Sequence, residues 1–153
     1  MNIHFTLLPE AVGISDAGSK QAVLERLADQ FAAIYAIDRG LLLERLKARE
    51  ELGSTGFGRG VAMPHARIPG VTRPVAAFLR MTAPVPFGST DGVPVSFVFA
   101  LISPEQAGAA HLQALAAISR TMRDDRMCER LAKAISPEEL YGILSNVTDR
   151  NAA

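Results

Sequence analysis

A glycine-rich segment that ends in a histidine marks the middle of this chain: residues 53–70 read GSTGFGRGVAMPHARIPG. The glycines are Gly53, Gly56, Gly58 and Gly60. Glycine lets a backbone approach a ligand closely and exposes N–H groups, which favours anions. His65 follows a short apolar run, and histidine is a nucleophile that titrates near neutral pH. The segment therefore predicts a histidine that carries a negatively charged group, for which phosphoryl is the natural candidate.

The residues before this segment are predicted to be helical. Apolar side chains at helical spacing predict an amphipathic helix over 20–36, with Ser19 as its N-cap. A second helix is predicted over 39–51, which Asp38 caps and Gly53 ends. The first 18 residues are predicted to form a loop with at most one short turn.

From Gly60 onward, the pattern of the sequence changes from helical to strand-like. Short segments rich in Val, Phe and Leu, separated by Pro/Gly turns, predict strands over 61–64, 75–82 and 94–102. The last is nearly all apolar, as expected of a central strand that is covered on both faces. Residues 84–87 could form an edge strand, where proline is tolerated.

The helical period returns from about residue 105, where a stripe begins at His111. Further helices are predicted over about 125–134 and from Ser136, which starts a capping box, to about 145. The order of helices, strands and helices predicts an α/β fold bordering on α+β, with a small mixed β-sheet sandwiched between helices.

Composition narrows the function classes. A length of 153 residues predicts one domain over 1–153. Sixteen basic and sixteen acidic side chains cancel, which argues against a nucleic-acid partner. The single cysteine, Cys128, excludes an intramolecular disulfide and fits a reducing cytoplasm. No signal peptide is recognisable, and the densest apolar run, 95–102, is too short to span a bilayer, so membrane insertion is not expected.

The glycine segment does not fit the nucleotide-binding loops. It lacks the Gly-Lys-Ser/Thr ending of a Walker A loop and the Gly-x-Gly-x-x-Gly spacing of dinucleotide sites. A turn-rich connection between helix and sheet is an equally good interpretation of the glycines. Ser54 and Thr55 lack the surroundings of a hydrolase nucleophile, so they are expected to cap, or to donate to a bound anion or to the His65 ring.

The histidines allow two interpretations. Arg59 and Arg67 flank His65 and could meet phosphate oxygens, and His111 is the natural second group. A partly buried histidine that is hydrogen-bonded to the backbone explains His111 equally well. Two histidines without nearby cysteine or acidic ligands form a poor metal site, so no metal is expected.

Three segments together resemble a known family. They are REELGSTGFGRGVAMPH at 49–65, HLxxLxxI from His111, and PEELY at 137–141. This pattern resembles the enzyme IIA domains of the phosphoenolpyruvate-dependent phosphotransferase system, mannitol/fructose class, and covers nearly the whole chain. LGSTG at 52–56, in a stand-alone domain, is most similar to the nitrogen-regulatory branch. Two features depart from the family: Ala66-Arg67 replaces a frequent Gly-Lys, and a fused transport domain is not expected.

The resemblance implies a mixed sheet flanked by helices and a cytoplasmic phosphoryl carrier. His65 would be phosphorylated by an HPr-like histidine phosphocarrier, with His111 and Arg49 as its active-site partners and no cofactor. The expected phosphoryl-binding residues are Ser54, Thr55, Gly56, Gly58, Gly60 and Arg67, and Phe57, Val61 and Met63 are candidates for an apolar docking rim. Regulated partners would include potassium transporters or sensor kinases. The alternatives are a sugar-specific enzyme IIA that passes phosphoryl to an enzyme IIB, and an interaction module that is never phosphorylated.

Overall fold

A single mixed sheet organises the computed structural model, which describes residues 3–152, with side chains as far as Ser145. The strands are β1 (Thr6–Ser15), β2 (Gly56–Gly58), β3 (Val61–Ala62), β4 (His65–Ile68), β5 (Val75–Val85) and β6 (Val95–Pro104). In the described chain the sheet has the strand order β1-β5-β6-β3-β2, and β4 also pairs with β6. β5 and β6 are antiparallel, as are β2 and β3, whereas β1 joins β5 in parallel and β3 and β4 join β6 in parallel.

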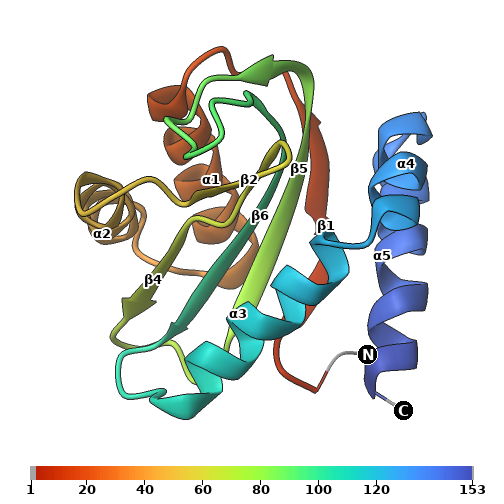
Figure 1. Ribbon diagram of the computed structural model, residues 1–153. Coiled ribbons are helices and arrows are strands. Elements are labelled where there is room, and N and C mark those ends of the chain that lie inside the picture. The colour runs from red at the N-terminus through yellow and green to blue at the C-terminus, as the bar shows by residue number, and fades with distance from the viewer. Residues whose placement is uncertain (1–2, 153) are drawn as a thin grey trace.

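Helices cover both faces of this sheet (Figure 1). The helices are α1 (Lys20–Tyr35), α2 (Arg39–Glu51), α3 (Ala109–Met122), α4 (Asp125–Lys133) and α5 (Pro137–Ala152). α1 and α2 pack on one face, and α3, α4 and α5 lie on the other (Figure 1). The predicted fold class, a small mixed sheet sandwiched between helices, is confirmed.

Alternation along the central strands builds a core on each face. On β6, Val98 and Ala100 point into the core under α1 and α2, whereas Phe97 and Phe99 point into the core under α3 to α5. This is the period-2 pattern of a strand covered on both sides. The apolar segment predicted as a central strand is therefore central, with neighbours on both of its edges.

The predicted helix starts are confirmed by their caps. The Ser19 hydroxyl accepts a hydrogen bond from the N–H of Ala22 at 3.1 Å, and the Asp38 carboxylate accepts one from Leu41 at 2.9 Å. The Ser136 hydroxyl accepts one from the N–H of Glu139 at 3.1 Å. Each bond satisfies an N–H group that has no partner within its helix.

Several predictions at the ends of elements are wrong. The first 18 residues are not a loop, because Thr6–Ser15 forms β1; Pro9 and Glu10 interrupt its apolar pattern, and the register shifts between Leu7 and Val12. No separate edge strand covers 84–87, because β5 continues to Val85, which pairs with Val95. The last helix does not end near 145 but extends to Ala152.

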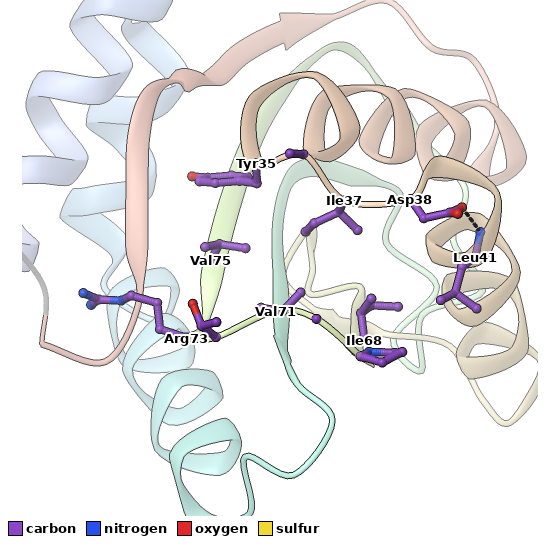
Figure 2. A pocket seen from close by; sticks show the side chains of 12 residues that line it. Tyr35, Ile37, Asp38, Leu41, Ile68, Val71, Arg73 and Val75 are labelled. Atoms are coloured by element: carbon purple, nitrogen blue, oxygen red, sulfur yellow. Dashed lines mark hydrogen bonds between the residues drawn. The ribbon is translucent and has the colours of Figure 1, made fainter.

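Tyr35 anchors the end of α1 to the sheet. Its hydroxyl donates to the carbonyl of Ala76 at 2.8 Å and accepts from the N–H of Leu8 at 3.1 Å, and burial raises its pKa to about 12. Tyr35 also borders a cavity of about 230 Å³ at the turn into α2, where Figure 2 shows Asp38 capping Leu41. No helix of the described chain is long and apolar enough to cross a bilayer.

Candidate functional site

Three elements bring the two predicted histidines together. His65 begins β4, which pairs in parallel with the end of β6, and the chain then passes from β6 into α3, whose first turn carries His111. The two rings have centroids 5.5 Å apart, with their planes inclined by 53°. Arg49 reaches the same place from the last turn of α2. A cavity of about 710 Å³ is bordered by these three residues and by Arg67.

Two hydrogen bonds define the protonation of the His65 ring. Its Nδ1 lies 2.8 Å from the carbonyl oxygen of Met63, and its Nε2 accepts a hydrogen bond of 3.2 Å from Nε of Arg49. A carbonyl can only accept and a guanidinium can only donate, so Nδ1 carries the proton and Nε2 keeps its lone pair. The neutral ring therefore presents an unprotonated Nε2, a nitrogen that can act chemically as a nucleophile. The expectation that Ser54 or Thr55 donates to the His65 ring is therefore wrong, because Nδ1 bonds to the Met63 carbonyl and both hydroxyls donate elsewhere.

The electrostatic surroundings keep His65 neutral. Burial lowers its pKa below the ordinary value of 6.5, and the positive charges of Arg49 and Arg67 lower it further. The bond to the Met63 carbonyl and the negative charge of Glu50 act in the opposite direction. A neutral imidazole at physiological pH is the form that can attack an electrophile.

Arg49 is held in place by the chain that follows α2. Its Nη1 donates to the carbonyl of Gly53 at 2.8 Å while its Nε reaches His65. The planar guanidinium is thus fixed along two of its donor directions. This geometry places a permanent positive charge beside Nε2 of His65.

His111 is buried and neutral. It has 5% of its surface exposed, and its Nδ1 lies 2.7 Å from the hydroxyl oxygen of Ser103. Burial, followed by the charges of His65 and Arg67, lowers its pKa to about 4. His111 can therefore offer one ring N–H to the shared cavity without bringing a charge.

The hydroxyl groups of Ser54 and Thr55 donate to other parts of the chain and not to His65. Ser54 Oγ donates to the carbonyl of Phe87 at 2.6 Å and accepts from the N–H of Gly56 at 3.0 Å. Thr55 donates its hydroxyl to the Glu50 carboxylate, which also accepts from the Thr55 N–H at 3.2 Å. Both residues border a second cavity of about 350 Å³ that extends to His65.

The glycines lie apart from the histidines. A Cβ on Gly56 would meet Ser89 and one on Gly58 would meet Asp91, while the carbonyl of Gly60 accepts from Ser96 and Phe97. Gly58 and Gly60 have φ of 102° and 78°, which the tight β2–β3 hairpin requires. None of the three borders the two described cavities at His65. The structure does not bring these glycines to the histidines.

Two further sequence candidates lie elsewhere. Arg59 forms an ion pair with Asp125 and donates to the carbonyl of Arg123 at 3.0 Å, so its guanidinium is occupied on the α3–α4 side. Val61 is fully buried in the core under α3 to α5, so its assignment to a docking rim is wrong. Phe57 and Met63 are partly exposed and border the smaller cavity.

Sequence reasoning missed Glu50 and Ser103. The Glu50 side chain is 6% exposed and binds Lys20 Nζ at 2.8 Å as well as Thr55. In the sequence, Glu50 could have been noticed because it stands beside Arg49 in the segment that resembles the family. Ser103 offered only a weak indication, a hydroxyl residue at the end of an apolar strand. Among the described residues, no group of three or more His, Cys, Asp or Glu is placed to hold a metal ion.

The mixed sheet covered by helices on both faces is the fold of IIA proteins of known structure. The family described as "Phosphoenolpyruvate-dependent sugar phosphotransferase system, EIIA 2" matches residues 7–147, and the chain belongs to this family.

Known relatives agree with this assignment. The nitrogen regulatory protein of Pseudomonas aeruginosa is 42% identical over 131 residues, which are 85% of each chain. The crystal structure of the nitrogen regulatory protein IIA-Ntr from Neisseria meningitidis is similar with a TM-score of 0.83 and 37% identity, covering 90% of this chain and 95% of that one. The mannitol IIA of Escherichia coli, at 20% identity and a TM-score of 0.75, covers 92% of this chain and 99% of its own and shows the same fold.

Proposed function

We propose that this protein is a regulatory phosphoryl carrier that accepts a phosphoryl group on Nε2 of His65 from an HPr-like histidine phosphocarrier. The observation that carries the proposal is the pair of hydrogen bonds on His65, which leaves the lone pair on Nε2 beside Arg49. Membership of the EIIA family and relatives named nitrogen regulatory protein support a nitrogen-regulatory role. The cytoplasmic location predicted from the sequence stays a prediction.

The transfer step needs no group beyond the two proteins. The Nε2 lone pair of His65 forms the new N–P bond as the N–P bond of the donor phosphohistidine breaks, and the electron pair returns to the donor ring. The Nδ1 proton stays on His65, where the Met63 carbonyl holds it. Arg49 moves from Nε2 onto the phosphoryl oxygens, where its charge offsets the charge that they carry.

The surface around the cavity fits a protein donor. Leu52 and Leu112 border it and expose 85% and 63% of their surfaces, and Arg45 and Arg67 lie on the same border. Exposed leucines around a reactive histidine form an apolar contact surface, and the arginines add charge that can orient an approaching phosphoryl group. We propose this rim as the docking face for the phosphocarrier.

Phosphorylation would also change which proteins bind this face. A phosphoryl group adds about −1.5 to −2 charges at neutral pH between the two leucines. The binding of partners that prefer one charge state would then depend on the supply of phosphoryl groups. We propose that such partners include potassium transporters or sensor kinases.

The test is phosphoryl transfer from phosphoenolpyruvate through enzyme I and the phosphocarrier, followed by intact mass. The wild type should gain one acid-labile phosphate, and His65→Ala should gain none. His4→Ala is the matched control, because it removes the histidine nearest the N-terminus, and it should behave like the wild type. A phosphate that persists in His65→Ala would show that the site is wrong. Wild-type protein that stays unmodified with active donors would indicate a module used for binding alone.

A further inference from the structure

Ser103 places a hydroxyl group against the ring of His111. It lies near the end of β6, is fully buried, and its Oγ is 2.7 Å from Nδ1 of His111. In the described part of the chain, this hydroxyl forms a hydrogen bond with His111 alone. The bond joins the sheet to the first turn of α3, where His111 meets His65.

The direction of this hydrogen bond follows from what a buried hydroxyl needs. If Ser103 accepted a proton from Nδ1, its own O–H would be buried without an acceptor, and an unsatisfied buried donor is destabilising. If Ser103 donates to Nδ1, both groups are satisfied. A neutral imidazole whose Nδ1 accepts must carry its proton on Nε2.

We propose that Ser103 is a positioning residue that donates its hydroxyl proton to Nδ1 of His111 and thereby keeps the His111 ring proton on Nε2. His65 is held in the opposite tautomer, with its proton on Nδ1. The two neighbouring rings then present one nucleophilic nitrogen and one N–H donor to the same cavity. Burial keeps His111 uncharged, since its pKa is about 4, so the tautomer decides what it offers at neutral pH.

The consequence for transfer rests on the proposed function. An N–H donor on Nε2 of His111 can bind an oxygen of the phosphoryl group on His65, whereas a lone pair there would repel it. Losing one hydrogen bond that holds a tautomer should slow transfer about five- to tenfold, as expected for an interaction of roughly 1 kcal/mol.

The direct test is the protonation of the His111 ring nitrogens, read from their ¹⁵N NMR shifts at pH 7. Wild-type protein should show an unprotonated Nδ1 and a protonated Nε2 on His111, assigned with His4→Ala and His65→Ala. Ser103→Ala should populate the Nδ1–H tautomer and slow phosphoryl transfer. Thr121→Val is the matched control, because it removes another buried hydroxyl, one that bonds within α3 to Ala117, and it should leave the tautomer unchanged.

A protonated Nδ1 on His111 in the wild type would overturn the proposal without any variant, so it stays testable if Ser103→Ala does not fold. An unchanged tautomer in folded Ser103→Ala would overturn it as well. Failure of the wild type to accept phosphoryl from active donors would contradict the proposed function instead, and the NMR result would still decide the role of Ser103.

Discussion

At His65, two neighbours decide which ring nitrogen can react. The Met63 carbonyl holds the proton on Nδ1, and Arg49 faces the lone pair on Nε2. Both partners come from residues close to an element boundary, where the chain turns from β3 into β4 and from α2 into the glycine segment. The position of the free lone pair on His65 is therefore set by a backbone carbonyl as well as by a side chain.

Substitution of Arg49 by lysine tests this geometry. Arg49→Lys keeps the charge but cannot donate to both the Gly53 carbonyl and His65 from one planar group. We expect phosphoryl transfer to slow about 100-fold with the fold intact, the cost typical of removing one well-placed donor. Stopped-flow transfer from the phosphocarrier measures this, with the exposed Arg120→Lys as control. Equal rates in the two variants would show that charge alone suffices.

The histidine pKa values predict how stability depends on pH. The pKa of His111 is about 4 in the folded protein and near the ordinary value of 6.5 in the unfolded chain. Between these two pH values the unfolded state therefore binds more protons than the folded state. The contribution of His111 to the free energy of unfolding should be fully present above pH 6.5. It should fall by ~1–3 kcal/mol as the pH drops towards 4. Urea unfolding at pH 7 and pH 4.5 measures this loss, which should be smaller in His111→Gln. An identical loss in that variant would assign the effect to other groups.

At the scale of elements, Glu50 links α1, α2 and the glycine segment. Its carboxylate meets Lys20 at the start of α1 and Thr55 beyond the end of α2, one residue along the chain from Arg49. The segment that positions Arg49 is thus held by a buried, paired charge. Buried carboxylates of this kind are costly to leave without their partners.

Glu50→Gln should therefore affect both stability and the site. Losing the charge leaves Lys20 without its partner, and we expect a loss of about 2 kcal/mol in the free energy of unfolding. The pKa of His65 should also fall, because the negative charge of Glu50 raises it. Urea unfolding and an NMR titration of His65 measure the two effects. Thr55→Val keeps the carboxylate as a control, and a pKa that falls equally there would argue against a charge effect.

At the scale of the whole molecule, one sheet is shared by two cores. Neighbouring residues of β5 face opposite ways, with Phe78 in the core under α3 to α5 and Leu79 in the core under α1 and α2. Neither core can lose its sheet face without exposing the other. The prediction of one domain over 1–153 remains open to experiment.

We expect a single cooperative unfolding transition for this reason. Phe31→Ala in one core and Ile118→Ala in the other should each cost about 2–5 kcal/mol and shift the whole transition. Far-ultraviolet and near-ultraviolet circular dichroism should give the same midpoint for each variant. Separate midpoints, with one core melting first, would show two folding units.

The sequence alone determined the elements whose pattern is local. Three local patterns were predicted correctly: the helical spacing of α1 and α2, the caps at Ser19 and Asp38, and the apolar run of β6. Each pattern can be recognised within a dozen or so neighbouring residues. His65 and His111 could be singled out because histidine carries the chemistry, whereas Arg49 was expected only through the family resemblance. β1 and β4 could not be predicted, because β1 is interrupted, β4 is short, and each exists through pairing with a distant strand. β2 was missed because it is a three-residue, glycine-rich strand of a tight hairpin.

Only the tertiary structure decided how the site is assembled. The parallel pairing of β4 with β6 brings His65 and His111 to one cavity and leaves Gly56, Gly58 and Gly60 in a hairpin outside it. Ser103 and Glu50 gain their roles from the same packing. A serine or a glutamate has no pattern of its own in a sequence, because its partners are set by register and burial between segments far apart in the chain.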